Sequence, residues 1–102
     1  MVQIIENKLE EIIALSKVHN VSSFALFGSA AKDSMNEQSD LDFLVEFSEE
    51  IDVLNYADNY FSFLEELENL LGKKIDLVSK NSLKNPILIE EIDRSKVNLY
   101  AA

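Results

Sequence analysis

Glycine and proline, the residues that most readily end a helix or a strand, are scarce in this chain. Only Gly28, Gly72 and Pro86 occur among its 102 residues. Gly28 directly follows the apolar run 21–27, and Gly72 follows the amphipathic run 52–71. Pro86 stands after an asparagine, a pair typical of a helix start because asparagine caps the first turn and proline fits its first position. These breakers therefore predict a few long elements and mark several of their ends.

Hydrophobic periodicity predicts that helices and strands alternate along the chain. Some segments carry apolar residues at helical spacing, whereas others are short apolar runs typical of strands. The predicted elements are, in order, helix 3–19, strand 21–27, short helix 29–35, strand 40–47, helix 52–71, strand 74–79, helix 86–94 and strand 97–100. This order predicts one α+β domain over residues 1–102, in which a small mixed β-sheet is packed with helices.

The predicted helix 52–71 has more apolar surface than one buried face requires. Its main stripe is expected to comprise Val53, Ala57, Tyr60, Phe61, Leu64, Leu67 and Leu71. An aromatic patch left exposed on a small domain usually marks a protein interface. Tyr56, Tyr60 and Phe63 are therefore candidates for contact with a partner protein or with a second copy in a homo-oligomer.

The charge of the chain is strongly acidic and excludes some classes of partner. Nine Lys and Arg stand against nineteen Asp and Glu, which gives a net charge of −10. Nucleic-acid backbones and anionic membranes are bound through clustered Lys and Arg, so neither is an expected partner. A basic protein, or an anion accompanied by a metal ion, fits this charge better.

Nothing in the sequence predicts export or membrane insertion. No apolar run approaches the roughly 18 residues of a membrane span, and the N-terminus lacks the basic patch of a signal peptide. The chain has no cysteine, which removes disulfides, thiolate catalysis and zinc–thiolate sites. Hydrophobic residues make up 47% of the chain, enough for one core. We expect a cytoplasmic protein.

A candidate phosphate-binding turn lies at the end of the first predicted strand. Gly28 and Ser29 stand between that strand and a short helix, where backbone N–H groups point outward and favour anions. Glycine also allows a phosphate to come close to the backbone. The same dipeptide is common in ordinary turns, so it predicts a phosphate site only together with other residues.

Acidic residues on two predicted strands could complete such a phosphate site. Asp40 and Asp42 are two positions apart on a strand, so their side chains project from one face. Asp76 interrupts an otherwise apolar strand, and a buried acid there would need a partner or a cation. If the two strands pair, the three carboxylates form a triad suited to two Mg²⁺ ions and phosphoryl or nucleotidyl transfer. The alternative for the first pair is an ordinary solvated face.

These motifs together resemble those of a known family. The runs 26–29 (Leu-Phe-Gly-Ser), 39–45 (Ser-Asp-Leu-Asp-Phe-Leu-Val) and 75–78 (Ile-Asp-Leu-Val) are similar to those of polymerase-beta nucleotidyltransferases. The resemblance extends over about residues 20–100. The length of the chain resembles the minimal nucleotidyltransferase branch of that superfamily.

The resemblance implies an activity, a set of site residues and a partner. By this resemblance, Gly28 and Ser29 would bind the triphosphate of ATP, and Asp40 and Asp42 would bind two Mg²⁺ ions. Asp76 would bind one of those ions and help to activate the acceptor hydroxyl. Minimal nucleotidyltransferases are typically encoded beside a HEPN-domain toxin. They act as its antitoxin by binding it, by transferring AMP from ATP to one of its tyrosines, or by both.

One stretch departs from the family pattern. Members often have Gly-Ser-x-Ala-Arg-Gly here, whereas this chain has Lys32 and Asp33 in the last two places. Lys32 keeps a positive charge for phosphate but lacks the planar fork of arginine. Asp33 adds negative charge near the expected triphosphate, unless it pairs with Lys32 or faces water. The departure favours a second hypothesis, in which a catalytically weak antitoxin neutralises its partner by binding alone.

Two further possibilities are disfavoured. Transfer to a small molecule such as an aminoglycoside usually requires an additional acceptor-holding domain, for which this chain has no residues left. His19 is the only histidine and lies at a predicted helix end without a companion ligand, so we expect a surface or capping role for it rather than a catalytic one.

Overall fold

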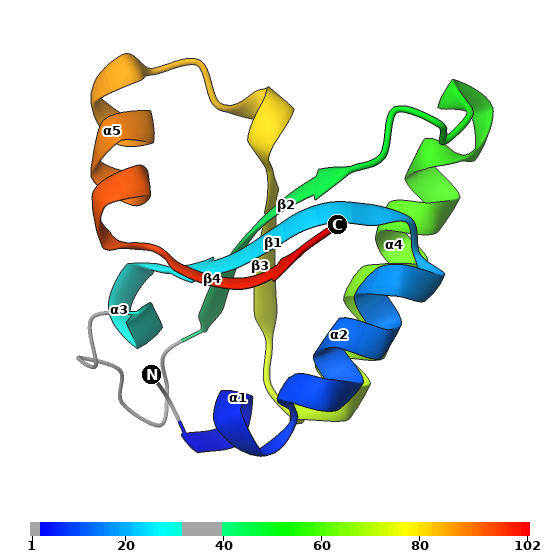
Figure 1. Ribbon diagram of the computed structural model, residues 1–102, viewed down its shortest axis with the longest axis horizontal. Coiled ribbons are helices and arrows are strands. Elements are labelled where there is room, and N and C mark those ends of the chain that lie inside the picture. The colour runs from blue at the N-terminus through cyan, green and yellow to red at the C-terminus, as the bar shows by residue number, and fades with distance from the viewer. Residues whose placement is uncertain (1–2, 32–39) are drawn as a thin grey trace.

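Four strands form one mixed sheet at the centre of the molecule (Figure 1). The computed structural model describes residues 3–31 and 40–102. The strands are β1 (Val21–Phe27), β2 (Leu41–Phe47), β3 (Ile75–Ser79) and β4 (Val97–Ala101), in the spatial order β3-β2-β1-β4. β1 pairs antiparallel with β2 and β4, whereas β2 and β3 are parallel. The predicted α+β fold with a small mixed sheet is confirmed.

The helices follow the predicted order, with one break that was not predicted. They are α1 (Gln3–Asn7), α2 (Leu9–Val18), α3 (Gly28–Ala31), α4 (Val53–Leu71), the single 3₁₀ turn η1 (Lys80–Ser82) and α5 (Pro86–Ser95). The helix expected over 3–19 is divided at Lys8, and Ile5 of the first part is fully buried in the core. Of the short helix expected over 29–35, positions 32–35 lie outside the described residues.

Local capping chemistry sets the ends of the longer helices. The Asp52 side chain accepts a hydrogen bond from the Leu54 N–H at 3.1 Å and begins α4. Gly72 ends α4 with a φ of +65°, the left-handed conformation that glycine adopts without strain. Asn85 accepts from the Ile87 N–H at 2.9 Å and begins α5. The helix ends predicted from Gly72 and Asn85-Pro86 are therefore confirmed.

The main core lies between one face of the sheet and helices α2 and α4. Phe63 of α4 is fully buried, with its ring centroid 5.3 Å from that of Phe24 and 6.0 Å from that of Phe47. Phe24 in turn stacks on Phe43 at 4.7 Å. This aromatic cluster fixes α4 against the strands, because such ring contacts add specific geometry to the burial of apolar area.

The buried stripe of α4 differs from the predicted one. Val53 is 88% exposed and Phe61 62% exposed, although both were expected in the stripe. Phe63, one of the candidates for an interface, is core, and the observed stripe comprises Tyr56, Tyr60, Phe63, Leu64, Leu67 and Leu71. The first turns of α4 project beyond the end of the sheet (Figure 1), so their apolar side chains have no strand to cover them.

His19 is a buried structural residue. It caps α2 and is only 5% exposed, so the expected capping role is confirmed and the surface position is wrong. Its Nδ1 lies 2.9 Å from the Leu15 carbonyl oxygen, and its Nε2 lies 2.9 Å from Glu66 Oε2. The Asn59 amide donates to the His19 carbonyl at 2.8 Å. These contacts tie the end of α2 to α4.

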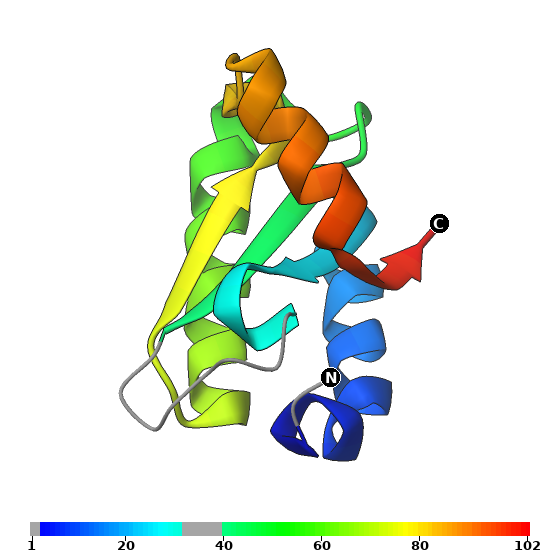
Figure 2. The same cartoon turned by 90° about the vertical axis from the view of Figure 1, so that its left-hand side faces the viewer.

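The opposite face of the sheet is covered only in part. α4 and α5 lie on opposite sides of the strands (Figure 2). Ala25, Leu44 and Ile92 are buried but separate from the main cluster, so they form a smaller apolar contact beneath α5. Within the described residues, no helix combines the length and apolar character needed to cross a bilayer.

Candidate active site

The candidate site begins where β1 ends. Gly28 has a φ of +73°, which turns the chain from β1 directly into α3. Phe27 pairs with Asp42 on β2, so the turn lies beside that carboxylate. A Cβ atom at position 28 would overlap Asp42 Oδ2 and come within 3.1 Å of its Cγ. Gly28 is therefore required both by its backbone conformation and by the closeness of the Asp42 side chain.

The parallel pairing of β2 with β3 brings the acids together. Asp42 is directly opposite Asp76, and Leu41 is opposite Ile75. Because side chains alternate along a strand, both acids face away from the core that contains Leu41 and Ile75. A row across the sheet consequently comprises Gly28 at the end of β1, Asp42 on β2 and Asp76 on β3.

Like charges gather at this row. The pKa of Asp42 is raised, first by its partial burial and then by the charges of Asp76 and Asp40. Like charges disfavour ionisation in this way when no cation lies between them. Asp40, just before β2, is exposed yet close enough to contribute. The three acids singled out in the sequence therefore lie near one another.

Two expectations about this site are changed or left open by the structure. Asp76 is exposed rather than buried, because it lies on the opposite face of β3 from Ile75 and Leu77, which are buried in the core. Lys32 and Asp33 lie outside the described residues, so the departure from the family pattern has no structural account. The backbone of Ser29 is in the first turn of α3.

The carboxylates fit a divalent cation by ligand type. Mg²⁺ takes oxygen ligands and commonly uses one or two carboxylates plus phosphate oxygens. Within 3–31 and 40–102, no three His, Cys, Asp or Glu side chains already converge on one ion position. Carboxylates without a cation repel one another, so they are expected to converge only when an ion offsets that repulsion. Metal binding at Asp40, Asp42 and Asp76 therefore stays a prediction.

α4 holds β3 from its outer edge, a feature not predicted from the sequence. The Lys74 carbonyl accepts from the Leu41 N–H, so by alternation the backbone groups of Ile75 and Leu77 point away from β2. The Tyr60 hydroxyl donates to the Leu77 carbonyl, and Glu68 accepts from the Ile75 N–H at 3.1 Å. These bonds satisfy edge groups on both sides of Asp76 and fix its strand.

The charge of the site also affects the pKa of Tyr60. Its pKa is raised by burial, then by the charge of Asp76 and by Tyr56. An aromatic residue at the core-facing position of a helix gives no local sign of such a role. Only the packing of α4 against β3 reveals it.

Comparison with known proteins agrees with this geometry. Residues 7–102 match the family model described as polymerase beta, nucleotidyltransferase. The protein adenylyltransferase MntA of Thermococcus cleftensis is 39% identical over 88 residues, which cover 78% of this chain and 84% of that protein. A solved structure provisionally named a minimal nucleotidyltransferase has a TM-score of 0.71 and 32% identity, over 91% of this chain and 90% of that one.

A more distant structure shares the fold. It contains a tri-AMPylated Shewanella oneidensis HEPN toxin in complex with MNT antitoxin, with a TM-score of 0.64 and 19% identity over 95% of this chain and 72% of that one. The family match spans the sheet, the Gly28 turn and all three acids. This chain therefore belongs to the polymerase-beta nucleotidyltransferase family, in its minimal nucleotidyltransferase branch.

Proposed function

We propose that this protein transfers AMP from ATP to a tyrosine hydroxyl of a HEPN-type toxin and acts as its antitoxin. The observation that carries the proposal is the row formed by Gly28, Asp42 and Asp76. It joins a turn suited to phosphate with acids suited to metal ions. Support for the acceptor comes from the name of the MntA relative and from the AMPylated toxin in the distant complex.

The chemistry requires one bond to form as another breaks. The acceptor oxygen bonds to the α-phosphorus of ATP, and the bond from that phosphorus to the departing pyrophosphate breaks. Bound Mg²⁺ would stabilise the charge that develops on the phosphate oxygens. Asp40 and Asp42 would hold two such ions, which would offset the repulsion among the carboxylates.

The remaining residues would position the two reactants. Backbone N–H groups at Gly28 and Ser29 would bind the triphosphate, with Lys32 supplying positive charge. Asp76 would share one metal ion and accept the proton of the attacking hydroxyl. Its exposure on the edge strand leaves room for a protein acceptor.

Transfer of label from α-labelled ATP tests this proposal directly. The purified protein is mixed with Mg²⁺ and the small protein encoded beside its gene, and label on that neighbour is measured. Asp40→Asn, Asp42→Asn and Asp76→Asn should each abolish labelling while leaving the fold intact. Asp58→Asn, an exposed acid on α4, is the matched control and should label normally. Wild-type rates in any of the three site variants would remove the catalytic assignment.

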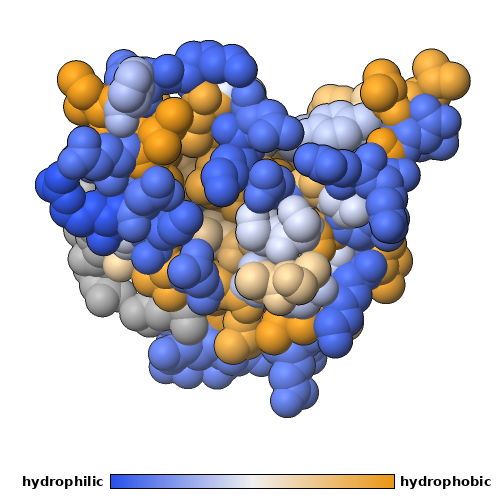
Figure 3. All heavy atoms as spheres, turned by 45° about the horizontal axis from the view of Figure 1, so that its top comes forward, coloured by the Kyte–Doolittle hydropathy of each residue, from blue (hydrophilic) through white to orange (hydrophobic). Residues whose placement is uncertain are grey.

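Exposed apolar surface favours a second candidate, neutralisation by binding alone. Val53 and Leu54 are 88% and 86% exposed at the start of α4, and Phe61 is 62% exposed. Orange side chains gather at the projecting end of the molecule in Figure 3, over the first turns of α4. The net charge of −10 suits a basic partner face.

Toxin neutralisation in cells distinguishes the two candidates. If transfer is required, the variant with all three site aspartates changed to asparagine should no longer neutralise the toxin. If binding suffices, that variant should still neutralise it, whereas Leu54→Asp should lose both complex formation and neutralisation.

A further inference from the structure

The outer edge of β3, the side away from β2, is bonded to side chains of α4. The three that bond to it are Tyr56, Tyr60 and Glu68. They are spaced by four and then eight residues, so they lie close to one line along the helix. β3 runs in the opposite direction beside this line, because Tyr56 bonds to Ser79 and Glu68 to Ile75. One face of α4 thus takes the place that a neighbouring strand would have on this edge.

Asp76 lies between two of these contacts. Because backbone groups alternate along a strand, those of Asp76 point toward β2 and those of its two neighbours point outward. On one side Glu68 accepts from the Ile75 N–H at 3.1 Å, and on the other the Tyr60 hydroxyl donates to the Leu77 carbonyl. The backbone around Asp76 is therefore bonded alternately to β2 and to α4.

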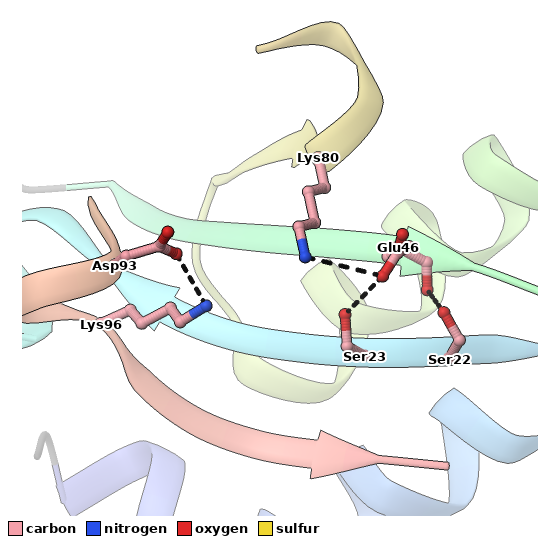
Figure 4. Close-up of polar contacts among 6 residues, drawn as sticks. All are labelled: Ser22, Ser23, Glu46, Lys80, Asp93 and Lys96. Carbon is pink, nitrogen blue, oxygen red and sulfur yellow. Dashed lines mark hydrogen bonds and ion pairs between the residues drawn. The ribbon is translucent and has the colours of Figure 1, made fainter. Parts of the chain in front are cut away.

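Other contacts restrain β3 less specifically. Burial of Ile75 and Leu77 holds the strand against the core, but apolar burial is non-directional. Lys80, directly after the strand, reaches over β2 toward Glu46, with its Nζ 3.9 Å from Oε1 (Figure 4). Both of these side chains are partly exposed, so solvent screens the pair and it stabilises the strand little. The directional restraint on the outer side of β3 therefore comes chiefly from the bonds to α4.

We propose that Tyr60 and Glu68 are positioning residues, which hold the Asp76 carboxylate in place for the transfer step. The inference rests on the proposed nucleotidyl transfer and adds what fixes the third acid of its site. Displacing a reacting group by about 1 Å can slow a reaction about a hundredfold. Asp76 would share one metal ion and accept the hydroxyl proton, so its placement affects the rate of transfer. The Gly28 turn and β2 would hold ATP, so its binding does not depend on these bonds.

Kinetics of label transfer from ATP to the partner test the proposal. Tyr60→Phe keeps the ring and removes only the hydroxyl, whereas Glu68→Met removes the acceptor at a similar side-chain length. Both variants should lower kcat by about tenfold to a hundredfold and leave the KM values for ATP and for the partner unchanged. Glu68→Gln keeps an oxygen that can accept from the Ile75 N–H, so it should retain most of the wild-type rate.

Three kinetic outcomes would overturn the inference. If Tyr60→Phe and Glu68→Met keep the wild-type kcat, the bonds serve only to cover a sheet edge that other chains could pair with. If the KM for ATP rises as much as kcat falls, the substitutions disturb the whole site rather than one acid. If Glu68→Gln is as slow as Glu68→Met, the hydrogen bond to the strand is not what matters at this position.

Hydrogen exchange of the free protein gives a readout that needs neither ATP nor a partner. The Asp76 amide, which faces β2, should exchange about twofold to tenfold faster in Tyr60→Phe than in the wild type. Tyr56→Phe removes a hydroxyl that bonds to the Ser79 side chain at 3.1 Å, so it should leave this exchange unchanged. Equal exchange in Tyr60→Phe and the wild type would refute the hold on the strand. If the wild type labels no partner, the proposed function fails, and the exchange rates still decide whether Tyr60 restrains Asp76.

Discussion

Replacing Gly28 with alanine should have two effects: strain in a left-handed backbone conformation and displacement of the Asp42 carboxylate. A matched control can separate them. The chain offers a matched control in Gly72, whose φ of +65° is close to the +73° of Gly28. A Cβ atom at position 72 meets nothing within 4 Å, whereas one at position 28 overlaps the Asp42 carboxylate. The two substitutions therefore share the strain and differ in the clash.

The expected stability changes are modest for both variants. A left-handed conformation costs a non-glycine residue about 1–2 kcal/mol. The clash at position 28 is with the end of a side chain, so Asp42 can turn away at a further cost of about 0.5–1.5 kcal/mol. With about 4–8 °C per kcal/mol for a domain of this size, Gly72→Ala should lower the Tm by roughly 4–16 °C. Gly28→Ala should lower it somewhat further, and both variants should remain folded at 25 °C.

The expected activities differ far more than the stabilities. Displacing a reacting group by about 1 Å can cost about a hundredfold in rate. Gly28→Ala should therefore lose roughly a hundredfold in AMP transfer, whereas Gly72→Ala should keep the wild-type rate. Thermal unfolding and label transfer at 25 °C are measured on the same preparations. Equal activities in the two variants would refute the reasoning, because Gly28 would then matter only for its backbone conformation.

Three further outcomes are expected. Because burial and the neighbouring acids raise the pKa of Asp42 on folding, ionised Asp42 opposes folding. Asp42→Asn should therefore stabilise the protein at pH 7 by about 0.2–1 kcal/mol, the range for charges that solvent screens. Urea unfolding should show this gain shrinking as the pH falls toward about 4. Phe63→Ala should cost about 3–5 kcal/mol in urea unfolding, whereas Phe61→Ala, at an exposed position, should change stability by about 0.5 kcal/mol or less. Asp76→Asn should lower the pKa of Tyr60 in an absorbance titration, and an unchanged titration would contradict the electrostatic contact between them.

Local sequence signals determined the strands, most helix ends and the identity of the acids. Gly72 and Asn85-Pro86 could be interpreted correctly because caps act within one turn of the chain. The strand at 21–27 was predicted at its observed bounds because its apolar run ends at a glycine. Asp40 and Asp42 stood out because they are two positions apart on one strand, and Asp76 because it interrupts an apolar strand.

Only the tertiary structure decided which faces and edges these elements present. The buried side of α4 centres on Phe63 because its ring packs against those of Phe24 and Phe47. Helical periodicity alone is also compatible with a buried stripe rotated by one residue. Asp76 is exposed because it lies on the face of the sheet opposite the core that contains Ile75 and Leu77. The sequence by itself thus determined the chemistry available at the site, while strand pairing and packing determined its arrangement, because these depend on contacts between distant segments.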